Sequence, residues 1–278
     1  KTLCHLLSRQ LTIGQVINRS ANSSQQAVDF IGAGSAGSLD NLLPADIWLI
    51  ATPDDEIAAA GQALLESGVL EAGNIVFHCS GSLGANAFQF ASQGVSRASV
   101  HPIHSFANPS QSIQTFAGSH CAVEGEPQAV EVLSSLFNAI GALPFDIDGD
   151  RKVLYHASTV MACNYLVSLL ETSQQLLSAS GVSSTEANPL EPLIRQTMDN
   201  FFASDAKSAL TGPIARGDDK TVARHLAALE AEPDRPVWQQ VYSALGNAAV
   251  PISAQQGQAS AESLEIIQKL LTPNISGH

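Results

Sequence analysis

A single stretch of this chain, Lys152–Leu170 (KVLYHASTVMACNYLVSLL), restricts the fold more than any other. Apolar residues recur through it at helical spacing, and neither Gly nor Pro occurs from residue 151 to residue 180. This pattern predicts one long helix. Because the sequence before it and the sequence after it follow different patterns, we expect the helix to join two domains.

The polar residues of this helix form a stripe. At about 100° per residue, Lys152, His156, Thr159 and Cys163 fall within roughly 60° of one another, and Asn164 lies beside them. A polar stripe on an apolar helix is either a hydrogen-bonded network in the core or the wall of a binding site. The sequence leaves both interpretations open.

The first 150 residues alternate between strand and helix patterns. Continuous apolar strands at 46–51 and 74–79 are typical of a parallel sheet that is buried on both faces. Thr52 is expected as the N-cap of the next helix, with Pro53 at its first position. Further strands are expected at 11–17, 97–100, 119–124 and 142–147, and helices at 23–31 and 126–140. The alternation predicts β-α-β units and an α/β fold with a doubly wound parallel sheet.

After Asp150 the pattern predicts helices alone. They are expected near 151–180, 186–203, 218–231, 235–250 and 255–272, with a polar loop at 204–216. We therefore predict a doubly wound domain over residues 1–150 and an all-α domain over residues 151–278.

Charge and cysteine content exclude several classes of protein. Only 13 Lys and Arg residues oppose 26 Asp and Glu residues, a formal net charge of −13. Nucleic acids and anionic membranes need clustered Lys and Arg, so we expect neither as a partner. The four cysteines form no C-x-x-C pair, which favours free thiols in a reducing compartment. With no apolar run of 18 residues and no signal peptide, the sequence predicts a soluble cytoplasmic protein.

The segment Gly32-Ala-Gly34-Ser-Ala-Gly37 matches the G-x-G-x-x-G pattern of dinucleotide-binding loops, but its context differs. That motif follows a buried strand and opens a full helix. Here the preceding residues look helical, so we interpret the segment as a connecting loop. If residues 1–10 form the first helix and residues 11–17 the second strand, the first strand and the glycine loop of the sheet lie upstream of Lys1, outside this sequence.

Asn18, Arg19 and Ser20 follow the expected second strand. In NAD-binding folds an acidic residue at this position bonds the ribose hydroxyls, whereas an Arg with neighbouring polar groups suits the 2′-phosphate of NADP. Taken alone, Arg19 is equally well explained as a solvated turn residue. Within the whole architecture it favours NADP(H) as the cofactor.

Ligands bind at the carboxyl ends of strands in open α/β sheets. Polar groups follow three predicted strands here, so we expect Thr52, Pro53, Asp54, Ser80 and His101 to contact the cofactor. His78, which lies within an apolar strand, is either a core histidine bonded to backbone or a site residue. His101-x-x-His104 is a poor metal pair because Pro102 breaks its spacing, and no metal is predicted.

The segment Ala209–Asp218 is the most unusual part of the helical half. Gly212-Pro213 forces a turn, and Asp218 can cap the following helix. Thr211 and Arg216 then lie near a helix N-terminus, where they could hold a carboxylate. The alternative is a capped loop with a surface Arg.

Four segments, taken in order, resemble a known family: HCSGSLGANAF, SVHPIHSF, YHASTVMACNYLVSLL and LTGPIARGD. They are similar to Rossmann-like NADP-binding proteins with an uncharacterised helical C-terminal domain, relatives of the 6-phosphogluconate-dehydrogenase-like reductases. Some members resemble ketopantoate reductases. The resemblance implies a homodimer formed through the helical domain and an active site between the two domains.

These observations lead to one main hypothesis, an NADPH-dependent reductase of a small 2-oxo acid such as ketopantoate. Hydride transfer to a ketone needs a proton donor, for which His156 is preferred over Lys152. Asn164 would orient the substrate oxygen, and Arg216 or Thr211 would bind its carboxylate. The alternatives are an imine reductase resembling pyrroline-carboxylate reductase and a non-catalytic NADP-binding regulator.

Overall fold

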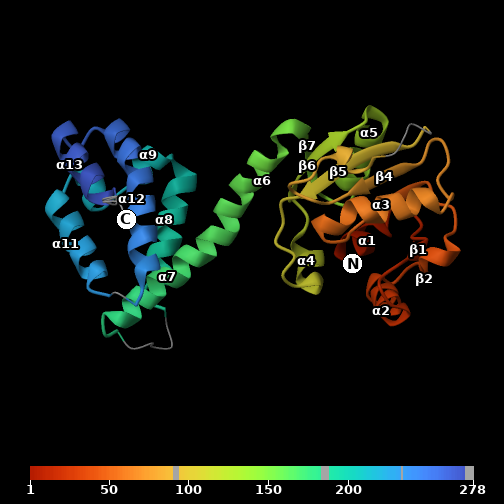
Figure 1. The fold of residues 1–278 in the computed structure, drawn as a ribbon, viewed down its shortest axis with the longest axis horizontal. Helices are drawn as coiled ribbons and strands as arrows, with labels where there is room; N and C mark the ends of the chain where they lie inside the picture. Colours follow the sequence, from red (N-terminus) through yellow and green to blue (C-terminus); the bar gives the residue numbers. More distant parts are fainter. Residues whose placement is uncertain (90–93, 183–187, 233, 273–278) are drawn as a thin grey trace, which may run out of the picture. The chain divides into compact units, whose positions relative to one another are not determined.

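The computed structural model describes residues 1–89, 94–182, 188–232 and 234–272. It divides into two compact units, Lys1–Cys163 and Asn164–His278. The first unit holds the sheet, and the described part of the second consists of helices joined by loops (Figure 1). The prediction of an α/β domain followed by an all-α domain is confirmed. The division falls inside the long helix, not at its start after Asp150, because Lys152 at the first turn is bonded to the sheet.

The first unit alternates strands with helices. Its elements are α1 (Thr2–Leu7), β1 (Gln15–Val16), α2 (Ala21–Ile31), β2 (Ser35–Ala36), β3 (Ile47–Ile50), α3 (Ile57–Glu66), β4 (Ile75–His78), β5 (Ser96–Pro102), α4 (Pro109–Thr115), β6 (His120–Gly125), α5 (Pro127–Ala139), β7 (Leu143–Asp146) and α6 (Lys152–Val160). The main sheet has the order β3-β4-β5-β6-β7, and β1 pairs with β2 in a separate parallel pair.

One strand departs from the predicted parallel sheet. β6 runs antiparallel to β5, whereas β3-β4, β4-β5 and β6-β7 are parallel. The segment between β5 and β6 contains one helix of seven residues, α4. The main neighbour of α4 is α1, so α4 does not serve as the crossover helix of a β-α-β unit, and the prediction of parallel pairing is wrong for this pair of strands.

The main sheet is buried on both faces. Ile75 and Phe77 of β4 pack into a core with Leu133 and Phe137 of α5, whereas Val76 packs on the opposite face. That second core includes Ile57 and Leu64 of α3, so helices cover both faces (Figure 1). The apolar run that predicted a doubly covered strand is thereby explained.

The helix after β3 begins later than predicted. Pro53 is the N-cap of a 3-10 turn over Asp54–Glu56, and α3 starts at Ile57. The prediction of Thr52 as N-cap and Pro53 at the first helical position is wrong. The acidic residues Asp54–Glu56 close a tight turn before the α-helix begins.

The glycine-rich segment is a connecting loop, as predicted. Gly32 caps the C-terminus of α2 with left-handed geometry, and β2 follows at once. Gly34 has a φ of +85°, and a side chain there would meet the carbonyl oxygen of Gly14 at 2.6 Å. Its glycines therefore serve chain reversal next to β1, and β1 itself is shorter than the predicted strand at 11–17.

The second unit is built from helices. They are α7 (Leu166–Ala179), α8 (Glu191–Ala203), α9 (Ala206–Ala209), α10 (Pro213–Arg216), α11 (Asp219–Glu230), α12 (Pro236–Gln256) and α13 (Ala261–Leu271). Two short helices, α9 and α10, occupy the predicted polar loop at 204–216. The predicted start of the second helix at residue 186 lies outside the described residues. α12 continues through Pro251, where the prediction ended it, because buried Val250 and Ser253 hold both sides of the proline.

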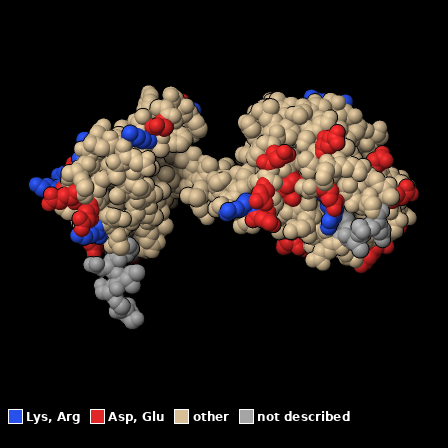
Figure 2. Space-filling model, turned by 90° about the horizontal axis from the view of Figure 1, so that it is seen from above, with Lys and Arg blue, Asp and Glu red and all other residues tan. Residues whose placement is uncertain are grey.

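The long helix is continuous but not uniform. Between α6 and α7, Met161–Tyr165 forms a π-helical turn. The stretch Gly149–Ala179 is long and apolar enough to cross a membrane by length and composition, although no part of its most apolar window is buried. The sequence analysis did not predict this helix as a candidate membrane span, because it looked for an uninterrupted apolar run of 18 residues. Figure 2 shows that the visible surface of this helix is mostly uncharged.

Candidate functional site

A row of polar side chains crosses the buried sheet. His78 of β4 pairs in register with Ser99 of β5, and Ser99 pairs in register with Glu124 of β6. Residues in register on neighbouring strands point to the same face of a sheet. The side chains of His78, Ser99 and Glu124 therefore lie side by side on one face of the sheet. It is the same face against which α3 packs at Val76.

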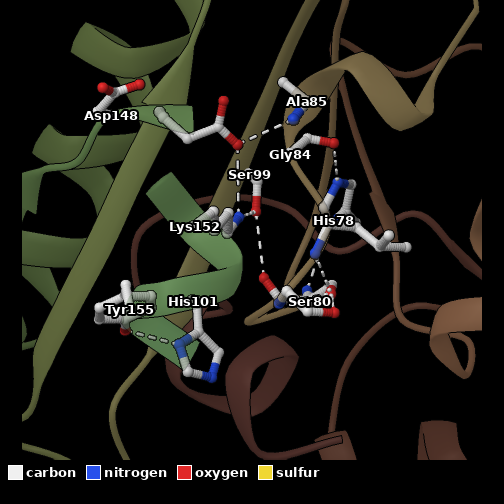
Figure 3. Close-up of polar contacts among 12 residues, drawn as sticks. His78, Ser80, Gly84, Ala85, Ser99, His101, Asp148, Lys152 and Tyr155 are labelled. Carbon is white, nitrogen blue, oxygen red and sulfur yellow. Dashed lines mark hydrogen bonds and ion pairs between the residues drawn. The ribbon is translucent and has the colours of Figure 1, made fainter. Parts of the chain in front are cut away.

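Lys152 at the start of α6 bonds to two members of this row. Its side chain is fully buried, and its ammonium donates to Ser99 Oγ and forms an ion pair with Glu124 Oε1 at 3.4 Å (Figure 3). Glu124 Oε1 also accepts from the Ala85 amide at 2.8 Å. Burial lowers the pKa of the Lys152 ammonium, and the Glu124 carboxylate offsets part of that effect. Lys152 is thus a partnered core residue, and its burial argues against direct contact with a substrate.

His78 is a core histidine. The Ser80 amide donates to its Nδ1 at 3.2 Å, so Nε2 carries the proton and donates to the Gly84 carbonyl at 3.0 Å (Figure 3). Burial lowers its pKa to about 4, which keeps the ring neutral near neutral pH. Of the two interpretations left open for His78, the structure supports the backbone-bonded one.

Two other histidines converge on Gly81. A methyl group placed on this glycine would lie 2.9 Å from Nε2 of both His101 and His156, and closer still to Cδ2 of His156. The two imidazole rings meet edge to face with centroids 5.6 Å apart. His101 stands near the carboxyl end of β5, His156 stands on α6, and Gly81 follows β4. Gly81 therefore permits two ring nitrogens to approach one point beside the strand ends.

Tyr155 completes this cluster. Its hydroxyl lies 2.7 Å from Nδ1 of His101 (Figure 3). Burial raises the pKa of Tyr155 to about 12 and lowers the pKa of His101 to about 4, an effect to which neighbouring His156 adds. Both groups are therefore neutral near pH 7. When the phenol donates to Nδ1, the ring proton of His101 lies on Nε2, toward Gly81.

Asp54 ties two strand ends together. Its Oδ2 accepts from the hydroxyls of Ser80 at 2.7 Å and Ser82 at 2.9 Å. Ser80 Oγ also accepts from the amides of Ser82 and Leu83, so it holds the loop after β4 in shape. Thr52 and Pro53 are exposed beside this network. Of the predicted cofactor contacts, Asp54, Ser80 and His101 come from adjacent strands β3, β4 and β5.

Asn18, Arg19 and Ser20 lie between β1 and α2. Ser20 is the N-cap of α2 and forms a capping box with Ser23. The backbone amide of Asn18 donates to Ser24 Oγ at 2.9 Å. Arg19 is exposed and makes no hydrogen bond or ion pair within the described chain. Its guanidinium is therefore free to meet an anion.

The remaining predicted site residues lie in the second unit. Asn164 is exposed and belongs to the π-helical turn. Thr211 precedes the short helix α10, and Arg216 ends it, two residues before Asp218, the N-cap of α11. Asp218 caps α11 as predicted, accepting from Thr221 N at 3.0 Å. Its pKa is lowered by Thr221 first and by Arg216 to a smaller extent.

Four residues of the first unit escaped the sequence analysis: Gly81, Ser99, Glu124 and Tyr155. Tyr155 precedes His156 and was visible in the same motif, but nothing local showed that it reaches β5. The partners of Lys152 are 53 and 28 positions away in the sequence. Among the described residues, no group of three or more His, Cys, Asp or Glu side chains could hold a metal ion.

Comparisons with known proteins agree with this architecture. A family described as a domain of unknown function, DUF2520, matches residues 119–249. Protein TM1727 from Thermotoga maritima is 20% identical, with a TM-score of 0.65 over 98% of this chain and 95% of its own. BF3122 from Bacteroides fragilis, assigned as an NADP oxidoreductase, is 20% identical with a TM-score of 0.69, covering 91% and 92%.

A third similar structure is a reductive aminase from Aspergillus terreus in complex with NADPH and ethyl-5-oxohexanoate. It is 17% identical, with a TM-score of 0.55 over 97% of this chain and 87% of its own. A comparison with curated proteins found no match. At these identities the likenesses show that the fold is Rossmann-like with a helical C-terminal domain.

Because His78 is neutral in the folded protein, we expect the free energy of unfolding of the first unit to fall at acidic pH. The unfolded ring titrates near pH 6.5 and the folded ring near 4, so the unfolded state binds more protons between these values. Stability of the first unit should therefore fall as the pH is lowered from about 6.5 to about 4, by roughly 3 kcal/mol from His78 alone. Urea unfolding followed by Trp48 fluorescence in a Trp238→Phe background measures this.

His78→Gln should flatten the pH dependence by up to one proton per molecule, and His101 will keep a residual slope in the same window. His120→Gln, at an exposed histidine of the same unit, is the matched control. An unchanged slope in His78→Gln would contradict the assignment.

Because Lys152 and Glu124 form a buried ion pair, we expect the effects of substituting them on stability to be non-additive. Lys152→Met leaves the Glu124 carboxylate, whose side chain is only 12% exposed, without its cation and should cost about 3–5 kcal/mol. Lys152→Met combined with Glu124→Gln should recover a large part of this loss. Equal destabilisation of the single and double variants in urea unfolding would show that the two groups are not coupled.

Proposed function

We propose that this protein is an NAD(P)-dependent oxidoreductase, preferentially using NADPH, whose chemistry takes place at the strand ends beside Gly81. One observation carries the proposal: two histidine rings, from β5 and α6, converge beside Gly81, which has no side chain to keep them away from the strand ends. Gly81 lies at the carboxyl edge of parallel strands, where ligands bind in this class of sheet. The similar structures assigned as NADP or NADPH proteins support the same activity.

The residues present fit a nicotinamide dinucleotide. Arg19, exposed and unpaired within the described chain, suits a 2′-phosphate, and Asn18 and Ser20 flank it at the start of α2. Thr52, Pro53 and the Asp54–Ser80–Ser82 network would shape the edge that receives the rest of the molecule. When bound, the cofactor supplies hydride.

The histidine cluster supplies the proton. Reduction of a carbonyl leaves a developing alkoxide that needs a donor within hydrogen-bond reach. His156 is the proposed acid because its ring lies against Gly81, beside the strand ends where a ligand would bind. Tyr155 and His101 form a second, neutral donor pair, in which Nε2 of His101 points toward Gly81. Lys152 positions α6 from the core.

The substrate is a small molecule with a C=O or C=N group. A 2-oxo acid such as ketopantoate is the first candidate. The roles predicted from the sequence for Asn164, Thr211 and Arg216 in binding it stay predictions, since these residues belong to the second unit. A second candidate is an imine, because the similar structures include a reductive aminase and an imine reductase from Streptomyces aurantiacus. The two differ in charge at the substrate, so a substrate panel separates them.

Turnover of His156→Ala tests the proposed acid. The protein should oxidise NADPH, measured by absorbance, with a member of a panel of 2-oxo acids and cyclic imines. His156→Ala should lower kcat by about 10²-fold or more, the usual contribution of a general acid, with NADPH binding unchanged. Tyr155→Phe should lower it less, because His156 remains.

Two further results frame this test. His104→Ala, which removes a histidine bonded to Ser119 instead of one beside Gly81, is the matched control. Full turnover by His156→Ala would remove the mechanism. NADPH binding, measured by fluorescence, without turnover across the panel would favour the non-catalytic regulator.

We also propose that two copies associate through the long helix and α8. Val153, Leu154, Met161 and Val167 are each between 64% and 69% exposed, and Phe202 of α8 is 77% exposed. No Asp, Glu, Lys or Arg occurs from residue 153 to residue 170. Apolar surface of this extent needs cover. A second copy is favoured over a lipid bilayer because Asn164 and Ser168 interrupt the apolar surface with exposed polar side chains.

Phe202→Asp and Val167→Asp should weaken this association. Sedimentation velocity of the wild type should give a dimer, and each variant should shift it toward monomer because a buried unpaired carboxylate is costly. Ala228→Asp, at an exposed position of α11, is the control. A monomeric wild type that floats with lipid vesicles would instead identify the apolar helix as a membrane contact.

A further inference from the structure

The helical unit contains a pocket of its own. It has a volume of about 350 Å³ and lies among α7, α11, α12 and the segment around α10. Its wall is mainly apolar, with Leu169 and Leu176 from α7, Ile214 from α10, and Trp238, Val241 and Leu245 from α12. Concave, mostly apolar sites of this size with a few polar groups are typical of small-molecule sites. A cavity of about 150 Å³ holds benzene, so this one suits a molecule roughly twice that size.

The polar groups in this pocket are few. Tyr242 OH lies 2.9 Å from Nδ1 of His225, and burial raises the pKa of Tyr242, which keeps the phenol protonated. When Tyr242 donates to Nδ1, the Nε2–H of His225 remains available. Thr211 makes no hydrogen bond within the described chain, so its hydroxyl is available as well.

Other hydroxyls of the wall are already used. Thr172 and Ser173 donate to the carbonyls of Ser168 and Leu169 in their own helix, at 2.8 and 2.9 Å. Trp238 donates to Gln175 Oε1 at 3.3 Å. The unused donors are thus His225 and Thr211, and both can serve an acceptor oxygen.

The charge of the wall limits the ligand further. Among the described residues that line the pocket, none is Asp, Glu, Lys or Arg. A carboxylate there would meet no cation to offset its loss of water. A neutral ligand meets no such cost.

We propose that this pocket binds a neutral small molecule with an aromatic or branched apolar body and one carbonyl or hydroxyl oxygen. The oxygen accepts from Thr211 or His225, and the body packs on Trp238 and the leucines. The site lies within the helical unit and goes beyond the proposed reductase chemistry at Gly81. It is also distinct from the exposed apolar surface, because Val167 and Leu169 point about 160° apart on α7.

Trp238 reports on the pocket directly. The chain has two tryptophans, so Trp48→Phe leaves Trp238 alone. In that full-length background, acetophenone, a neutral aromatic ketone, should quench Trp238 saturably. Benzoate, its anionic counterpart, should quench only by collision. Toluene, which lacks the oxygen, should compete weakly with acetophenone.

Variants locate the binding. Ala249→Leu, which fills the pocket, should abolish saturable quenching, and Ala248→Leu, at the exposed neighbouring position of α12, should leave it unchanged. Thr211→Val should weaken the binding of acetophenone about five-fold, as expected for the loss of one hydrogen bond. The affinity for toluene, measured by competition, should stay the same. Circular dichroism confirms that each variant folds.

Three outcomes would overturn the proposal. One is quenching that stays collisional at all concentrations, and another is equal binding by Ala249→Leu and wild type. The third is binding of benzoate as tight as that of acetophenone. If Ala249→Leu instead weakens self-association in sedimentation while acetophenone fails to bind, a second copy fills the pocket. None of these outcomes depends on NADPH turnover.

Discussion

The buried ammonium of Lys152 is the interaction on which the arrangement of the first unit depends. A fully buried lysine is tolerated only where its charge is matched, and here the sheet supplies Ser99 and Glu124 in neighbouring strands. This fixes both the position and the rotation of the first turn of α6. Tyr155 and His156 follow three and four residues later, so they lie on the same side of the helix as Lys152. The core network thereby directs two candidate proton donors at the strand ends.

Gly81 is the matching constraint on the sheet side. Any side chain at this position would collide with His156 and His101, so the approach of α6 to the β4 loop requires its absence. The loop is held in turn by Ser80 Oγ, which joins two backbone amides to the Asp54 carboxylate. The candidate site therefore combines a rigid loop with a helix that is anchored in the core. Such support is what a proton donor needs if it is to stay within reach of a reacting atom.

Helical spacing was enough to predict that Lys152 and His156 share a face, and strand ends were enough to predict that Asp54, Ser80 and His101 lie at one edge of the sheet. The partners were beyond that kind of analysis. Glu124 reaches Lys152 only because β6 runs antiparallel beside β5, whereas the alternation of strands and helices predicted parallel pairing. Tyr155 reaches His101 only because α6 is fixed in one rotation. Both contacts depend on long-range packing, which local patterns do not encode.

The geometry of the long helix explains why the residues of the predicted polar stripe do not all face the sheet. The predicted stripe assumed a uniform 100° per residue, which holds for α6 but not through the π-helical turn at Met161–Tyr165. A π-turn contains more residues than an α-turn, so side chains after Met161 are rotated away from the direction that the stripe assigned to them. Cys163 and Asn164 lie inside that turn, and both are exposed. Lys152 and His156 thus both face the sheet of the first unit, whereas Asn164 is exposed and belongs to the second unit.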